Sequence, residues 1–199
     1  WIQRQCTEAT DIYSNKDLSI NQTILGKIVT GYTAKNCQQT RIVDFGGGLA
    51  LEYLKMLSYG YQVKELDYYV IETEAVCNVG KTYYSEKEFP NFLGSREQIH
   101  FKSRLEELDI EYDIFHCDSS FQYIEDWRGE LAKVCSKSPP LILLCGMLTG
   151  DIPTFATVQN YYGHQLPVWF INKQEIVNFL CKKDYKLVFQ ENAEAKSFG

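Results

Sequence analysis

The chain has 199 residues, of which 45% are hydrophobic and 14% aromatic, enough to build the core of one domain. Its formal net charge is −6 and it has no basic run, which argues against a nucleic-acid backbone as the main partner. The longest apolar run, Leu141–Leu148, is too short to cross a bilayer, no signal-peptide pattern opens the chain, and the seven cysteines form no C-x-x-C pair. We therefore expect a single domain over residues 1–199 in a reducing cytoplasm, without a structural zinc or a disulfide framework.

The first predicted elements lead into a glycine-rich turn. Residues 1–39 are expected to form a helical lead-in, with a helix over Leu18–Val29, where apolar residues recur at helical spacing. The apolar run Ile42–Phe45 then predicts a buried strand, three glycines follow, and Leu49–Tyr59 again has helical spacing. A strand, a glycine turn and a helix build a ligand site in α/β sheets, because the crevice outside the carboxyl ends of the strands opens there.

The rest of the chain alternates between predicted strands and helices. Asn172, with Glu175 three residues later, has the capping-box pattern of a helix start, and Leu141–Cys145 is apolar on both faces, as in a central parallel strand. This alternation predicts a Rossmann-like, doubly wound α/β fold with a mostly parallel sheet. Further strands are expected at Tyr68–Ile71, Gln98–Lys102, Tyr112–Cys117 and Tyr185–Phe189, and further helices at Thr73–Phe89 and Ile124–Val134.

Two acidic residues stand beside the predicted crevice. Asp44 precedes the first glycine by two residues, and Glu72 ends the next strand 28 residues after Asp44. A carboxylate at Asp44 repels a pyrophosphate but suits an amino group, and the NAD fingerprint needs a glycine where Leu51 stands. The pattern favours S-adenosylmethionine, with Asp44 at its amino-acid end, directly or through water, and Glu72 on its ribose. The residues expected under the cofactor are Gly46, Gly47 and Gly48. The alternative is a glycine turn that only reverses the chain.

The chain resembles the class I S-adenosylmethionine-dependent methyltransferases, and more narrowly a family encoded among bacterial surface-polysaccharide genes. The resemblance runs from about Ile42 to Phe189 and implies a cytoplasmic enzyme without a metal. This enzyme would O-methylate a sugar or another small polar precursor of a surface glycan, with a small-molecule, nucleotide-sugar or glycan acceptor. The segments that carry the resemblance are Val43–Gly48, Tyr69–Glu72, Tyr112–Asp126, Thr157–Gln159 and Leu166–Phe170.

Three features depart from this family. Ala50 stands where a further glycine is frequent, and Asp118 stands where a serine is common. Class I sheets usually end in an antiparallel hairpin of two strands, but only nine residues follow Gln190, so the last strand is expected to be missing, cut off or supplied otherwise. By strand order, the remaining walls of the cofactor cleft are expected from Ser103 with Arg104 near the adenine, and from Asp118 with Ser119.

A long connection follows the fifth predicted strand. Gly146–Phe170, within a lid expected at residues 146–171, far exceeds the usual ~4–6 residues, so it is either functional or contains further structure. Its residues Gln159, Tyr162 and His164 are expected to face the acceptor. His164 is the candidate base, because the ordinary pKa of a histidine, ~6.5, suits proton acceptance near neutrality. The alternatives are a solvated histidine and aromatic residues that fill a satellite core.

Three classes of function remain open. The first is a methyltransferase acting on a small molecule or glycan. The second is a catalytically silent S-adenosylmethionine-binding module, to which the departures at Ala50 and Asp118 and the missing strand point. The third, a nucleotide-dependent oxidoreductase or epimerase, is disfavoured by Leu51. His116 lies inside a predicted strand and is expected to be structural.

Overall fold

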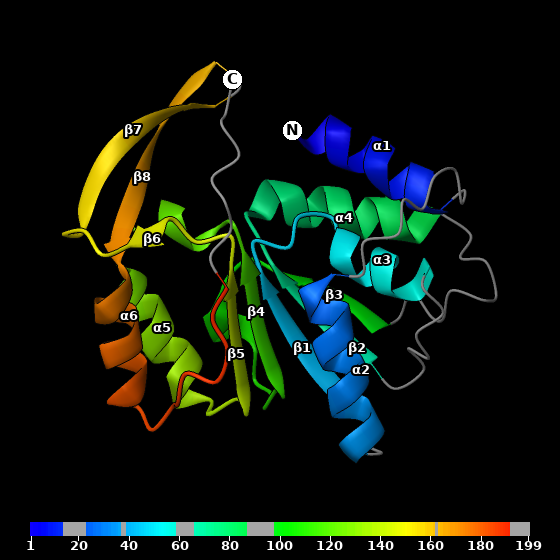
Figure 1. Cartoon of the computed structure of the whole chain (residues 1–199). Helices are drawn as coiled ribbons and strands as arrows, with labels where there is room; N and C mark the ends of the chain where they lie inside the picture. Colours follow the sequence, from blue (N-terminus) through cyan, green and yellow to red (C-terminus); the bar gives the residue numbers. More distant parts are fainter. Residues whose placement is uncertain (14–22, 37–38, 59–65, 87–97, 162, 192–199) are drawn as a thin grey trace.

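The core of the protein is a parallel β-sheet. The computed structural model describes residues 1–13, 23–36, 39–58, 66–86, 98–161 and 163–191. Five strands form the sheet in the order β3-β2-β1-β4-β5, and every neighbouring pair is parallel (Figure 1). The strands are β1 (Thr40–Phe45), β2 (Leu66–Ile71), β3 (Ile99–Lys102), β4 (Ile114–Asp118) and β5 (Leu141–Cys145).

Helices cover both faces of this sheet, which parallel strands require because neither of their faces can be left in water. One core cluster joins the sheet to the helices that lie before and between the first three strands, and a second joins it to the helices on the other side. The helices are α1 (Ile2–Tyr13), α2 (Ile24–Asn36), α3 (Leu51–Ser58), α4 (Glu74–Glu86), α5 (Trp127–Ser136) and α6 (Lys173–Cys181), with short 3-10 turns η4 (Leu105–Glu107) and η5 (Phe121–Tyr123).

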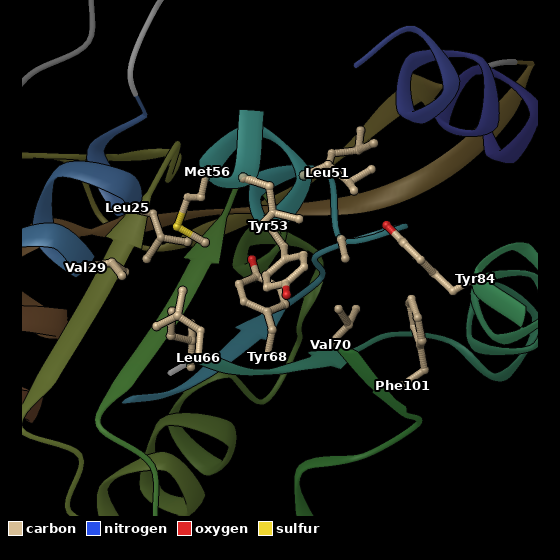
Figure 2. Packing of buried hydrophobic residues seen from close by; sticks show 14 of the residues in the cluster. Leu25, Val29, Leu51, Tyr53, Met56, Leu66, Tyr68, Val70, Tyr84 and Phe101 are labelled. Carbon is tan, nitrogen blue, oxygen red and sulfur yellow. The ribbon is translucent and has the colours of Figure 1, made fainter. Parts of the chain in front are cut away.

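Alternation along each strand divides the apolar residues between the two clusters. On the first face, Tyr68 of β2 packs against Tyr53 of α3 with ring centroids 5.3 Å apart, in the cluster that also contains Leu25 of α2 (Figure 2). On the second face, Phe115 of β4 and Trp127 of α5 are both buried in the other cluster. The two faces therefore have separate cores, and the polar residues discussed below interrupt only the first.

The structure confirms most of the predicted elements. The five strands that precede the long connection lie where they were predicted, and their parallel order confirms the doubly wound fold. The side chain of Asn172 accepts the backbone N–H of Glu175 at 3.1 Å, which confirms the predicted start of α6. Helix α5 starts three residues later than predicted, because Asp126 caps it by accepting the N–H of Gly129 at 3.0 Å.

Two predictions about the end of the sheet are wrong. β5 is not central: it is the edge strand, and all five of its residues are only half-buried. Tyr185–Phe189 forms no strand, and Leu187, Val188 and Phe189 are 52%, 81% and 66% exposed. A strand seated on the sheet would bury alternate side chains, whereas this segment buries none of these three.

The predicted lid is a β-hairpin rather than a loop. β7 (Phe155–Tyr161) and β8 (His164–Asn172) pair antiparallel, and a short β6 (Thr149–Gly150) pairs with β8, giving a second sheet in the order β6-β8-β7. Gly163, with a positive φ of 79°, makes the tight reversal between the long strands. The connection is long because it contains its own sheet. Among the described residues, no helix is long and apolar enough to cross a membrane.

Two phenylalanines test this assignment of the core and the edge. Phe115→Ala removes a fully buried ring and should lower the free energy of unfolding by about 3–5 kcal/mol. Phe189→Ala removes an exposed ring and should change it by less than about 0.5 kcal/mol. Urea unfolding of both variants provides the measurement. A loss above about 1 kcal/mol for Phe189→Ala would show that this segment does pair with the sheet.

Candidate functional site

The site begins at the turn between β1 and α3. The backbone N–H of Gly46 donates to the carbonyl of Ile71 at the end of β2, at 2.8 Å, so the turn starts level with the end of the neighbouring strand. Gly46, Gly48 and Ala50 have positive φ values of 73°, 57° and 56°. Alternating left-handed residues coil the chain tightly before α3 starts, a conformation that favours glycine. The positive φ of Ala50 is a conformation that glycine adopts without strain.

At each of the three glycines, a different side chain occupies the space that a Cβ would need. A Cβ on Gly46 would lie 2.1 Å from the hydroxyl oxygen of Ser120, and a Cβ on Gly47 would lie 2.3 Å from a carboxylate oxygen of Asp44. A Cβ on Gly48 would lie 2.1 Å from the amide oxygen of Gln5 in α1. A Cβ at any of the three positions would force the facing side chain to move, and Gly46 and Gly48 also have positive φ values that favour glycine.

Asp44 lies beneath this turn and is only 2% exposed. Its Oδ2 accepts the hydroxyl of Tyr68 at 2.5 Å, and its Oδ1 lies 2.7 Å from Nδ1 of His116. Asp44 and His116 are register partners on β1 and β4, and Tyr68 is buried on the same face of β2. Both carboxylate oxygens are therefore engaged from inside the protein. The predicted contact of Asp44 with a cofactor stays a prediction.

The charge of this network is balanced within the core. Burial by itself lowers the pKa of His116, but the charge of Asp44 and their hydrogen bond outweigh burial and raise this pKa to about 10. Burial, together with Asp44, also raises the pKa of Tyr68. The network therefore consists of an aspartate, a histidinium and a neutral tyrosine. His116 neutralises the carboxylate under the turn, in keeping with the structural role predicted for it.

Glu72 lies at the end of β2 and closes the turn from the other side. Its Oε1 accepts the N–H of Gly48 at 3.3 Å, and its Oε2 accepts the N–H of Thr73 at 2.9 Å. Burial raises the pKa of this carboxyl group, although the two N–H bonds act in the opposite direction. Each carboxylate oxygen keeps a further acceptor position. Glu72 is thus fixed beside the glycine turn with capacity to accept a hydrogen bond from a hydroxyl group.

The other predicted cleft residues follow β3 and β4. Ser103 directly follows β3, next to the end of β2, and its hydroxyl donates to Glu107. Asp118 and Ser119 are exposed at the end of β4, where the Ser119 hydroxyl donates to Asp118 at 2.8 Å. Ser119 also has a positive φ of 55°. These residues surround the same carboxyl edge of the sheet as the glycine turn, but the structure assigns them no ligand.

The hairpin brings two of the three predicted acceptor residues onto one face. Tyr161 pairs with His164 and Gln159 pairs with Leu166, and directly opposed residues of an antiparallel pair project to the same side. Gln159 and His164 therefore share a face, whereas Tyr162 lies outside the described residues. The amide oxygen of Gln159 accepts the hydroxyl of Tyr123 in η5 at 2.9 Å, which fixes this strand to the segment after β4.

Sequence reasoning missed Gln5, Tyr68, Tyr123 and Ser120 as parts of the site. Gln5 is 39 residues before the first residue of the acid–glycine motif, and no pattern connects the two. Tyr68 and His116 carried one usable signal: each is a polar residue on the face of a strand that is otherwise apolar. Such residues need a buried partner. The only acid buried on that face among the described residues is Asp44.

The fold is similar to that of solved methyltransferases. The glycopeptide N-methyltransferase MtfA, complexed with (S)-adenosyl-L-methionine, is 12% identical, with 84% of each chain covered and a TM-score of 0.53. A S-adenosylmethionine-dependent methyltransferase from Clostridium acetobutylicum is 8% identical over 98% of this chain and 94% of its own, with a TM-score of 0.56. CalS10 from Micromonospora echinaspora, an amino pentose methyltransferase involved in calicheamicin biosynthesis and solved with S-adenosylmethionine bound, is 8% identical over 92% and 88%, with a TM-score of 0.52.

These likenesses show that the chain has the Rossmann-like fold of class I methyltransferases. No protein-family model matches the sequence, and no curated protein matches it either. The narrower resemblance to a surface-polysaccharide family therefore stays a prediction.

Removing His116 tests the buried network. His116→Leu leaves Asp44 buried without its counter-charge and should lower the free energy of unfolding by about 3–5 kcal/mol. Because folding raises the pKa of His116 to about 10, the stability from this pair is complete below the ordinary pKa of ~6.5 and is lost as the pH rises towards 10. Urea unfolding at pH 6 and pH 9.5 measures this decline, which His116→Leu should lack.

The half-buried His100 of β3 provides the matched control. Its Nε2 lies 4.0 Å from a carboxylate oxygen of Asp67, so His100→Leu should cost less than about 1 kcal/mol. Equal losses for the two variants would contradict a special role of the pair between Asp44 and His116.

Proposed function

We propose that this protein is an S-adenosylmethionine-dependent methyltransferase that O-methylates a sugar or another small polar precursor in surface glycan biosynthesis. The observation that carries the proposal is the glycine turn closed by Glu72, whose Oε1 accepts the N–H of Gly48 at 3.3 Å. This arrangement places a fixed carboxylate and a tightly coiled backbone at the ends of two neighbouring parallel strands. Such an edge is where open α/β sheets bind nucleotide cofactors.

The residues at this edge suit the cofactor. Glu72 keeps acceptor positions for the two ribose hydroxyls, and the buried Asp44 supports the backbone on which the amino-acid end would lie. Ser103, beside the end of β2, would border the adenine, and Asp118 with Ser119 would line the other side. When bound, S-adenosylmethionine supplies a methyl group on a sulfonium, an electrophile that requires alignment more than activation.

The acceptor side is formed by the hairpin. Gln159 and His164 offer an amide and an imidazole on one face, and the bond from Tyr123 to Gln159 holds that face towards the segment after β4. An amide and an imidazole can both form hydrogen bonds to the hydroxyl groups of a polar ring such as a sugar. The comparison proteins include an amino pentose methyltransferase and a glycopeptide N-methyltransferase, which supports an acceptor with a sugar component. The free thiols of the described cysteines fit a cytoplasmic location.

Binding and turnover separate the proposed function from its alternatives. Calorimetry should show binding of S-adenosylmethionine and S-adenosylhomocysteine but not of NAD. Incubation with nucleotide sugars, followed by mass spectrometry, should then show the gain of one methyl group. Binding of S-adenosylmethionine without methylation of any nucleotide sugar or glycan would favour the silent binding module, and binding of NAD alone would favour the oxidoreductase.

Substitutions of Glu72 test the cofactor site. Glu72→Ala should weaken S-adenosylhomocysteine binding ~10- to ~100-fold, because hydrogen bonds to a charged group contribute about 1.5–3 kcal/mol. Glu72→Gln keeps an acceptor for the N–H of Gly48 but loses the charge, so its affinity should lie between those of the parent and Glu72→Ala. Glu74→Ala, in the exposed first turn of α4, serves as the control and should leave affinity unchanged. Parental affinity in Glu72→Ala would remove the ribose assignment.

Substitution of His164 tests the candidate base. If its imidazole accepts the acceptor's proton, His164→Asn should lower kcat ~10²- to ~10⁴-fold and leave cofactor affinity nearly unchanged. Turnover of the parent should fall in acid, where a histidine is protonated and cannot accept a proton. Gln165→Asn, an exposed neighbour on the opposite face of β8, is the control. Full activity of His164→Asn from pH 5.5 to 8 would show that alignment alone, or another base, drives the transfer.

A further inference from the structure

Gln5 reaches the glycine turn from a helix that has no part in the acid–glycine motif. Its amide oxygen accepts the backbone N–H of Leu49 at 2.9 Å. The same amide fills the position of a Cβ on Gly48, with its nitrogen 2.9 Å from that position. A Cβ on Gly48 would therefore force the Gln5 amide to move.

The position of this amide is determined by the packing of α1. Ala9 of α1 is fully buried, Ile12 packs against the first core cluster, and the Thr10 hydroxyl is 3.0 Å from the hydroxyl of Tyr83. Leu49 is held equally firmly, because its carbonyl accepts the hydroxyl of Tyr84 at 2.7 Å. In Figure 1, α1 lies above α3 and α4 on the side of the sheet where β1 ends. The packing of α1 and the hydrogen bond to Leu49 therefore hold Gln5 at the turn.

The oxygen and the nitrogen of the Gln5 side-chain amide have different hydrogen-bonding roles. The bond from the Leu49 N–H fixes Oε1 towards the backbone, so Nε2 and its two N–H donors remain. Within the part of the chain that the structure describes, Nε2 has no hydrogen-bond acceptor. Asp44, below the turn, is engaged from inside the protein by Tyr68 and His116. The donors of Gln5 are therefore available for an acceptor group above the turn.

We propose that Gln5 binds the carboxylate of the amino-acid end of S-adenosylmethionine through Nε2. This inference rests on the proposed function and extends it to a residue of α1. A carboxylate accepts hydrogen bonds from the amide donors, whereas an ammonium cannot. The charge balance below the turn permits it: His116 neutralises Asp44, so the buried carboxylate does not repel a second one. Glu72, which accepts the N–H of Gly48, remains for the ribose.

A charge placed at Gln5 tests this role without disturbing the fold. Gln5→Glu keeps an oxygen for the Leu49 N–H but replaces the donors with a negative group that repels a carboxylate. Calorimetry should show S-adenosylhomocysteine affinity lowered about 10-fold or more. The affinity for 5′-methylthioadenosine, which lacks the amino-acid end, should be nearly unchanged. Gln3→Glu adds the same charge at an exposed position of α1 and should affect neither ligand.

The outcomes distinguish this proposal from the function on which it rests. The thermal midpoint of Gln5→Glu should match that of the parent, since the bond to Leu49 is kept. Unchanged affinity for S-adenosylhomocysteine, or an equal loss for both ligands, would overturn the role of Gln5 and leave the proposed function intact. If the parent protein binds neither ligand, the proposed function fails and the assignment of Gln5 fails with it.

Discussion

The structure depends on the space around three consecutive glycines. Gly46, Gly47 and Gly48 each approach a side chain so closely that a Cβ would overlap it, and the three side chains come from different elements. Ser120 follows β4, Asp44 belongs to β1, and Gln5 belongs to α1. A turn of this kind joins the strand that precedes it to a neighbouring strand and to a helix near the start of the chain. A larger residue at any of these positions would force the facing side chain to move.

A buried charge pair makes this close packing possible. A lone carboxylate beneath the turn would be expensive to desolvate, and it would repel an anionic ligand group above. His116 supplies the opposite charge from the adjacent strand, and Tyr68 supplies a neutral donor from the strand on the other side. The polar network therefore lies across three neighbouring strands. The free-energy cost of desolvating its polar groups is confined to one face of the sheet. The other face has an apolar core of its own.

Two elements outside the sheet complete the site from opposite flanks. Figure 1 shows α1 and the hairpin of β7 and β8 standing on either side of the edge at which the parallel strands end. Gln5 attaches α1 to the glycine turn, and Tyr123 attaches the hairpin through Gln159. Each attachment is one hydrogen bond to a side-chain amide oxygen, donated by the Leu49 N–H in the first case and by the Tyr123 hydroxyl in the second. In the function proposed here, one flank faces the cofactor and the other faces the acceptor.

The sequence by itself determined the elements whose signal is local. Apolar runs such as Ile42–Phe45 predicted the parallel strands, and the pair Asn172 and Glu175 predicted a helix start, because backbone periodicity and capping act over a few residues. The long connection was expected to be functional or to contain further structure, but its pairing as a hairpin was not predicted, and Tyr185–Phe189 was predicted as a strand, because pairing partners are set at long range.

The candidate site divides in the same way. The glycines, Asp44 and Glu72 lie in two short segments of the chain, so their association with one crevice followed from strand order. That Asp44 pairs with His116, and that Gln5 fills the space above Gly48, depended on register and helix packing. Gln5 and Leu49 are separated by 44 positions in the chain, and Asp44 and His116 by 72 positions. Contacts over such separations leave no periodic pattern in a single sequence, so only the tertiary structure determines them.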